Sequence, residues 1–302
     1  WVRTGVVSLL PAQGAGCPCR MIDEATGEEM PAWTAEDGTL QFTARDIPAV
    51  GYRRYRLEPA GAAAPADETA GEMTIENQSF RLTVDAVSGE PLSLWDIANQ
   101  REILQPTEGM PFNVLLRASH LSTYSLGTYE VLQEDTPVEV SVERAPLVQT
   151  ITVRREQAIF AETVYRLETD QPWVEVTNQL DRSEMPYVPE ADHSDLYFFG
   201  FPFQMAEGEL SLELETAAGF LNPAKDLLPG ANGRGFSVQN VSALQGADGY
   251  TVLLPQHESF LVFANDVTRS GTFPGVNRPL LIAGAMAVAH EGSTVDKGVI
   301  AL

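Results

Sequence analysis

The stretch VEVSVERAPLVQTITVRR, residues 138–155, decides the fold class of this 302-residue chain. Apolar and polar residues alternate in its two halves, and a proline precedes each half. A period of two places successive side chains on opposite faces of a β-strand, so each half is predicted to be a strand with one buried face. Similar short runs recur from GVVSLL at residues 5–10 to FLVFAND at residues 260–266, bounded by Gly, Pro, Asn or Asp.

Helical signals are weak along the whole chain. None of the apolar runs repeats at a spacing of 3.6 residues over a dozen positions, which is the pattern of an amphipathic helix. The chain is therefore predicted to be all-β with antiparallel sheets. Antiparallel sheets with so many strands usually fold over on themselves, so the larger part is predicted to be a sandwich of several sheets.

The run AGAAAPADETAGE, residues 60–72, is rich in small residues and has neither alternation nor aromatic side chains. This composition is typical of a linker. The run divides the chain into a predicted small β-sandwich domain, residues 1–59, and a predicted large β-domain, residues 73–302.

The small domain is predicted to close with a kinked strand inside ARDIPAVGYRRYRLEP, residues 44–59. Pro48 fixes its own φ and favours an extended residue before it, whereas Gly51 tolerates a positive φ. From Tyr52 to Leu57 the side chains would then alternate between the two faces of the last strand.

Composition excludes several classes of partner. The net charge is −23, and neutralising phosphates would need clustered Lys and Arg, so nucleic acid and anionic membranes are excluded. The longest apolar run, residues 279–289, is too short for a membrane-spanning helix. We therefore expect a soluble protein, cytoplasmic or exported, of bacterial type. Cys17 and Cys19 lack a second Cys or His cluster and are interpreted as incidental thiols.

Both ends of the sequence suggest a longer polypeptide. The first residue is Trp1, and the start lacks the basic segment and cleavage site of a signal peptide. The end, DKGVIAL, is strand-like and has no polar tail. We expect that the chain was cut from something longer.

Several stretches resemble the glycoside hydrolase family 38 α-mannosidases. ARDIPAVGYRRYRL resembles the phrase that closes the family's small β-domain, and residues 73–104, MTIENQSFRLTVDAVSGEPLSLWDIANQREIL, resemble the opening of its large β-domain. Three more stretches follow in the family's order: residues 161–184, FFGFPFQM at 198–205, and residues 226–244. Each motif is weak alone, but their colinear order extends over most of the chain.

The resemblance implies a small β-sandwich followed by a galactose mutarotase-like supersandwich. In such enzymes a preceding catalytic domain holds zinc with two His and two Asp and supplies an aspartate nucleophile. The chain would then be a non-catalytic C-terminal portion without a cofactor of its own, whose partners are that upstream domain and carbohydrate. We expect an exposed apolar or aromatic face toward the missing domain.

Five residues are candidates for contact with a sugar. Asn232 and Arg234 lie in the glycine-containing loop 226–236 and have side chains suited to hydroxyl groups. His193 and Asp195 form a His-x-Asp, and His257 is a further isolated histidine. Zinc needs three or four converging ligands, so no metal site is predicted in this chain.

Two alternative functions stay open at the sequence level. A free-standing mutarotase-like epimerase would need a histidine and a carboxylate as acid and base, with His193 or His257 paired to a Glu. A carbohydrate-binding or scaffolding module would need no catalytic group.

Other conspicuous residues receive structural interpretations. Glu76 and Asp85 are interpreted as edge and turn residues and not as a catalytic pair. Trp95 and Trp173 are predicted to lie in strands and pack in the core.

Overall fold

A computed structural model describes the chain outside several short gaps. The described residues are 2–10, 19–34, 38–59, 73–104, 111–119, 128–132, 135–181, 183–185, 195–205, 211–229, 231, 235–254, 260–264, 280–289 and 299–301. Within them the fold is almost entirely antiparallel β-structure, with one short helix, α1 (Pro223–Asp226), as the sequence predicted. No helix in this part of the chain is long and apolar enough to cross a membrane.

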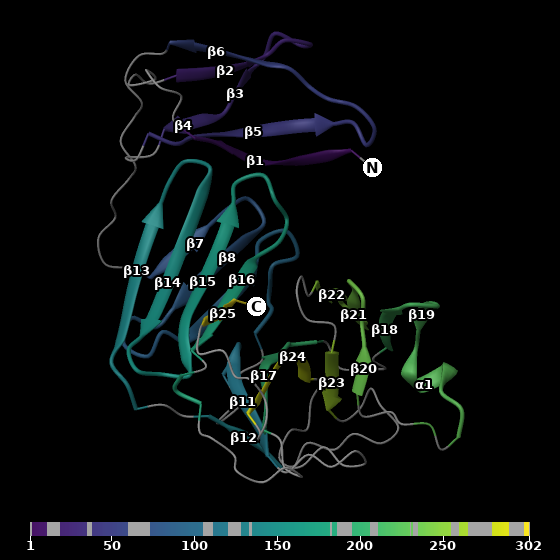
Figure 1. Cartoon of the computed structure of the whole chain (residues 1–302). Helices are drawn as coiled ribbons and strands as arrows, with labels where there is room; N and C mark the ends of the chain where they lie inside the picture. The colour runs from purple at the N-terminus through teal and green to yellow at the C-terminus, as the bar shows by residue number, and fades with distance from the viewer. Residues whose placement is uncertain are drawn as a thin grey trace.

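Two three-stranded sheets form the N-terminal unit, residues 2–59, at the top of Figure 1. One sheet has the order β1-β5-β4 and the other β3-β2-β6. Their bounds are β1 (Arg3–Leu9), β2 (Cys19–Asp23), β3 (Glu29–Met30), β4 (Ala32–Thr34), β5 (Leu40–Ile47) and β6 (Tyr55–Pro59). Buried residues from both sheets, including Met21, Met30 and Phe42, pack together as a small sandwich core.

The closing strand of this unit is shorter than predicted. β6 begins at Tyr55 and not at Tyr52, because the preceding residues make other contacts. Arg53 reaches the buried Asp23 carboxylate at 3.0 Å and donates to the Arg45 carbonyl oxygen at 2.9 Å. The predicted kink is present, with Gly51 at a φ of 154°. The predicted linker lies outside the described residues.

Four sheets form the rest of the described chain. Their orders are β10-β9-β8-β7, β13-β14-β15-β16-β25, β12-β11-β17-β24-β23-β20 and β19-β18-β21-β22. In the first two the bounds are β7 (Thr74–Glu76), β8 (Phe80–Val84), β9 (Pro91–Asp96), β10 (Arg101–Glu102), β13 (Val138–Arg144), β14 (Val148–Arg155), β15 (Phe160–Glu168), β16 (Glu175–Asp181) and β25 (Val299–Ala301). In the others they are β11 (Val114–Ser119), β12 (Thr128–Val131), β17 (Asp195–Pro202), β18 (Ser211–Thr216), β19 (Gly219–Leu221), β20 (Gly235–Ser237), β21 (Ser242–Gly246), β22 (Gly249–Leu253), β23 (Phe260–Ala264) and β24 (Leu280–Ala289).

The two strands predicted within residues 138–155 are confirmed as β13 and β14, and they pair as a hairpin from Val138↔Arg155 to Arg144↔Gln149. Ile151 and Val153 point inward and are fully buried. The sheet of β7 to β10 packs closely against this hairpin: Gly89 has a φ of 73°, and a Cβ there would collide with the Val153 side chain. Only glycine therefore fits at this turn.

One core cluster joins all four sheets. Buried side chains from β8, β15, β17 and β18, such as Leu82, Leu167, Phe199 and Leu214, contribute to it. This continuity is why the four sheets form one multi-sheet sandwich, as predicted.

A buried polar contact links two of these sheets. Asn113, just before β11, and Asn178 in β16 exchange side-chain hydrogen bonds of 2.9 and 2.7 Å, and Asn113 Nδ2 also lies 3.2 Å from the Tyr165 hydroxyl. Burial raises the pKa of Tyr165 to about 12, although the contact with Asn113 acts in the opposite direction. All three polar groups find partners, which is the usual condition for burying them.

Candidate functional site

Most of the predicted sugar-contact residues lie outside the described part of the chain. This holds for His193, Asn232, Arg234 and His257. Asp195 is the first residue of β17, where its backbone pairs with Ala289. Across the described ranges, no group of three or more His, Cys, Asp or Glu could hold a metal ion.

The start of the candidate loop 226–236 is fixed by a capped turn of helix. Asn222 precedes α1, and its Oδ1 accepts from Ala224 N at 3.1 Å. Its own backbone N–H donates to the Asp226 carboxylate at 2.7 Å, and its Nδ2 donates to the Ser211 hydroxyl at 2.9 Å. These contacts attach the start of the loop to β18.

The core prediction for Trp173 is wrong. Trp173 lies in the bend between β15 and β16 and its surface is 48% exposed, because the chain reverses direction there before the sheet can cover the ring. Trp95 does lie in a strand, β9, but it is only partly buried.

Glu76 and Asp85 make contacts that stabilise the local fold. Glu76 ends β7 and pairs with Arg81. The Asp85 carboxylate accepts the backbone N–H groups of Ser88 at 2.7 Å and Val87 at 2.9 Å, and these bonds hold the pKa of Asp85 below its usual value.

A tight turn of the large part, residues 168–171, contacts the edge strand β1 of the N-terminal unit. Gln171 Nε2 donates to the Thr4 carbonyl oxygen at 2.6 Å, and the Glu168 carboxylate accepts from Val6 N at 3.3 Å. These two side chains take the place of a neighbouring strand and satisfy backbone groups that an edge strand otherwise exposes. We call this contact the N-terminal joint.

The side chain of Asn77 makes hydrogen bonds to the turn of the N-terminal joint. Its buried Nδ2 donates to the carbonyl oxygens of Glu168 at 2.7 Å and Gln171 at 2.9 Å. Its Oδ1 accepts the backbone N–H groups of Ser79 at 2.9 Å and Phe80 at 2.8 Å. One amide side chain therefore connects the turn after β7 to the turn that supports the small unit.

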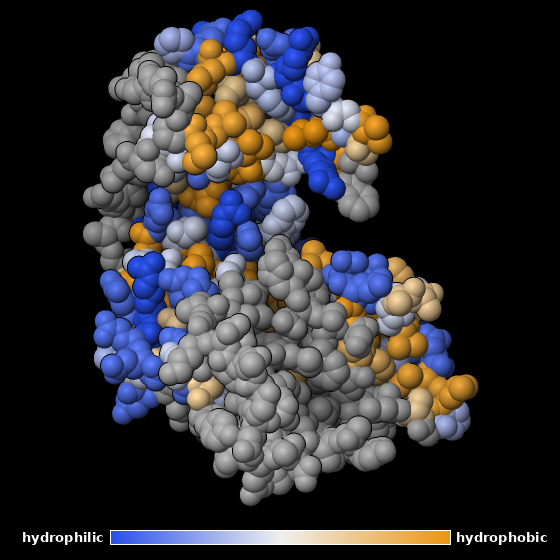
Figure 2. Space-filling view, in the orientation of Figure 1, coloured by the Kyte–Doolittle hydropathy of each residue, from blue (hydrophilic) through white to orange (hydrophobic). Residues whose placement is uncertain are grey.

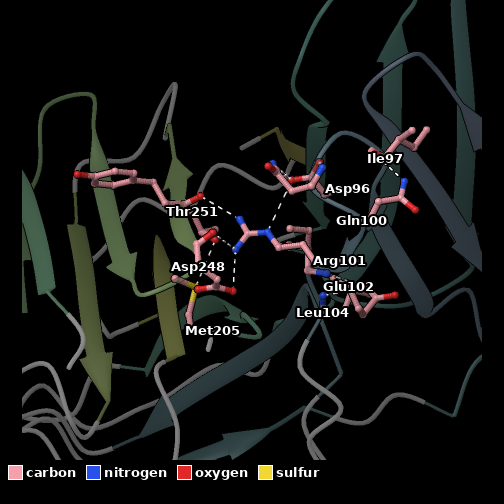
Figure 3. Close-up of polar contacts among 12 residues, drawn as sticks. Asp96, Ile97, Gln100, Arg101, Glu102, Leu104, Met205, Asp248 and Thr251 are labelled. Carbon is pink, nitrogen blue, oxygen red and sulfur yellow. Dashed lines mark hydrogen bonds and ion pairs between the residues drawn. The ribbon is translucent and has the colours of Figure 1, made fainter. Parts of the chain in front are cut away.

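The sheet β19-β18-β21-β22, together with α1, forms a lobe at the side of the molecule (Figure 1). Arg101 in β10 reaches across to the β21–β22 turn of this lobe, as Figure 3 shows. Its guanidinium donates to Asp248 Oδ2 at 2.9 Å and to the Tyr250 carbonyl oxygen at 3.2 Å. Its Nε lies 3.7 Å from the Asp96 carboxylate. We call this contact the lobe joint.

The two carboxylates beside Arg101 differ in burial. Asp96 is nearly buried and also accepts both the backbone and the side-chain N–H groups of Asn99, at 3.0 and 2.7 Å. Asp248, at the turn, is more exposed. The guanidinium thus bridges a buried acid of the large part and an accessible turn of the lobe, a geometry that a planar group with several donors supports.

The carboxylate of Glu102, beside Arg101, accepts hydrogen bonds from nearby residues of the same sheet region. Oε1 accepts the backbone N–H groups of Leu94, Ile103 and Leu104 at 2.8 to 3.1 Å, and Oε2 accepts the Ser93 hydroxyl at 2.6 Å. A carboxylate with four donors has little capacity left for a substrate, so Glu102 is a structural residue.

Both joints involve residues 73–104, the segment that resembles the opening of the family's large β-domain. Asn77 belongs to its ENQSF start, and Arg101 belongs to its REIL end. Sequence reasoning did not assign these residues a role. Only the resemblance of residues 73–104 to a family pattern marked the segment as a whole.

A family match found by comparison with known proteins begins inside this segment. Residues 75–215 match the family model described as the glycosyl hydrolases family 38 C-terminal domain. Among solved structures, "The crystal structure of an alpha-mannosidase from Enterococcus faecalis V583" matches with a TM-score of 0.62 and 9% sequence identity. At this identity the likeness shows the fold alone.

That match covers 100% of this chain but only 41% of the mannosidase chain, so the present sequence spans less than half the length of that protein. A search of curated proteins gave no match. The predicted resemblance to family 38 is confirmed, because residues 75–215 match the model of that family's C-terminal domain.

Proposed function

We propose that this chain is the non-catalytic C-terminal β-portion of an α-mannosidase-like glycoside hydrolase. The observation that carries the proposal is the pair of matches: a family 38 C-terminal domain, and a likeness that spans the whole chain but only 41% of a solved mannosidase. The proposal includes a galactose mutarotase-like supersandwich for residues 73–302.

The chemistry is assigned to a preceding zinc-dependent domain. In the described residues of this chain no donor set fits a metal ion, so no step of glycoside hydrolysis is assigned here. The contribution of this chain is to hold its own parts in fixed positions. Asn77 and Arg101 fix the N-terminal unit and the lobe to one central sandwich, which would present fixed surfaces to an upstream domain.

An activity comparison tests the proposal. The 302-residue chain and the polypeptide of the complete reading frame are purified and assayed on p-nitrophenyl α-D-mannoside, with and without added zinc. We expect zinc-dependent hydrolysis by the longer polypeptide alone. Hydrolysis by the 302-residue chain, or a reading frame without a preceding catalytic segment, would refute the proposal.

Contact with carbohydrate is a second part of the proposal. Asn232 and Arg234 follow the capped turn at α1, whose attachment to β18 would give the loop a fixed start. In the longer polypeptide Arg234→Ala is expected to raise KM with little change in kcat, because a hydroxyl contact made equally in substrate and transition state affects binding alone. Arg154→Ala, on the exposed sheet surface, serves as the control.

The alternatives predict different results. A free-standing epimerase would interconvert sugar anomers with the 302-residue chain alone, and a His193→Ala or His257→Ala change would abolish that activity. A carbohydrate-binding module would bind mannosides in isolation without any catalysis.

A further inference from the structure

The outer face of the lobe sheet β19-β18-β21-β22 has an unusual composition. The inner side packs against the main core through Leu212, Leu214 and Leu244, and Leu253 of β22 packs there as well. Thr251, between the outward residues of β22, donates to the Met205 sulfur at 3.5 Å on the same inner side. The remaining residues of each strand must therefore face outward, since side chains alternate across a strand.

The outward residues of the edge strand are large and apolar. Tyr250 and Val252 in β22 are 60% and 49% exposed, and Leu254, one residue beyond the strand, is 56% exposed. Ala243 lies opposite Val252 on the next strand. At the other side of the sheet, Phe220 in β19 is 65% exposed. An exposed apolar strand at a sheet edge favours unwanted association unless another surface covers it.

Acidic residues separate the two apolar edges of this face. Glu213 pairs with Ala243 and Glu215 pairs with Phe220, and cross-strand partners lie on the same face of a sheet. Figure 2 shows hydrophobic and hydrophilic residues interspersed over the lobe, at the right of the view. A complementary partner would be apolar at two sides and carry Arg or Lys opposite the two glutamates.

Elsewhere among the described residues the exposed apolar side chains are spread over several elements, including Leu9 in β1, Leu57 in β6 and Leu92 in β9. In the N-terminal unit, Leu10, Val50 and Tyr52 lie in turns or just beyond a strand end. Val87 is at the tip of a hairpin turn and Trp173 is in a bend. Single exposed apolar residues of this kind are normal on protein surfaces.

We propose that the outer face of the lobe sheet is the docking surface for the polypeptide segment that precedes residue 1. This inference rests on the proposed function. More than half of the matched mannosidase chain lies outside the aligned portion, so a large body is available to cover the face. A second copy of the chain is disfavoured, because a two-fold contact would bring together two copies of a face that carries Glu213 and Glu215, on a protein with a net charge of −23.

Hydroxyl-radical footprinting of the complete polypeptide and of the 302-residue chain tests the inference. Oxidation of Tyr250 and Phe220 is expected to be severalfold lower in the complete polypeptide. Tyr52, in the N-terminal unit, serves as the reference and is expected to oxidise equally in both. In the complete polypeptide, Val252→Asp should restore Tyr250 oxidation to the level of the shorter chain, whereas Val87→Asp should not.

The outcomes separate the inference from the proposed function. Mannosidase activity is measured on the same samples. Activity in the complete polypeptide without protection of Tyr250 and Phe220 refutes the docking face and leaves the proposed function standing. Protection without activity supports the docking face and refutes the proposed function. Protection that appears in the 302-residue chain as its concentration rises would identify a second copy as the partner and overturn the inference.

Discussion

The N-terminal joint and the lobe joint attach two peripheral parts of the molecule in different ways. At the N-terminal joint, side chains of one turn satisfy the backbone of an edge strand, and the turn is held by the buried amide of Asn77. At the lobe joint, the single guanidinium of Arg101 bridges a nearly buried acid and an exposed turn. The first joint combines hydrogen bonds of neutral amides with the charged Glu168 acceptor and the 2.7 Å ion pair between Asp170 and Arg45. The second joint depends on one guanidinium.

Because the contacts differ, the loss of one side chain should affect the two joints differently. Loss of a buried amide leaves several backbone groups without partners, and burial makes that costly. Loss of the guanidinium leaves one acid, Asp96, without its cation, but Asp248 is accessible to water. We therefore expect disruption of the first joint to affect the whole fold and disruption of the second to affect mainly the lobe.

The largest effect is expected for Asn77→Ala. The change removes two donated and two accepted hydrogen bonds at a buried position, so the free energy of unfolding should fall by about 3 kcal/mol. Urea denaturation measures the change. Asn99→Ala, an asparagine in an exposed turn, is the matched control and should cost about 1 kcal/mol or less. Equal losses for the two variants would contradict the role assigned to Asn77.

The next largest effect is expected for Arg101→Met, which keeps much of the apolar stem and removes the charge. Because Asp96 then lacks its cation, stability should fall by about 2 kcal/mol. Amide hydrogen exchange should accelerate in residues 242–253 and stay unchanged in residues 148–167. Arg154→Met, at an exposed ion pair, should change neither quantity measurably. Uniform acceleration over the whole chain would show that Arg101 does not act locally.

A smaller difference is expected between two side chains of the N-terminal joint. Gln171→Leu removes the 2.6 Å bond to Thr4 at a buried position and should cost about 1 to 2 kcal/mol. Asp170→Asn weakens the partly exposed 2.7 Å ion pair with Arg45 and should cost well under about 1 kcal/mol. Thermal denaturation in low and high salt distinguishes them, since only the Asp170 effect should diminish with salt. The reverse order would mean that charge dominates this joint.

The smallest effect is expected at a turn that belongs to neither joint. The backbone N–H groups of Ser88 and Val87 lower the pKa of Asp85, so its carboxylate stabilises the folded state. Because the folded pKa lies below the unfolded value of about 3.9, this contribution is present above that pH and is lost as the pH falls through the folded pKa. The stability difference between the wild type and Asp85→Asn should therefore shrink as the pH falls below about 4. A constant difference down to pH about 2 would contradict the assignment.

The joints themselves could not be predicted from the sequence. Asn77 and Gln171 are separated by 94 positions, and the Arg101 and Asp248 pair by 147. Nothing in their local sequence indicates which distant turn each contacts. The prediction for Trp173 failed for a related reason: an aromatic residue next to a strand pattern can lie in the bend, where the sheet does not cover it.

The sequence by itself determined the all-β class, the two strands within residues 138–155, the kink at Gly51 and the resemblance of residues 75–215 to family 38. These features depend on local alternation, on backbone constraints and on motifs that are contiguous in the chain. The tertiary structure alone decided that Asn77 and Arg101 hold the two joints and that Tyr250, Val252 and Phe220 share an outward face. The physical reason is that antiparallel pairing and sheet packing bring together residues far apart in sequence, and the strand register decides which face each side chain occupies.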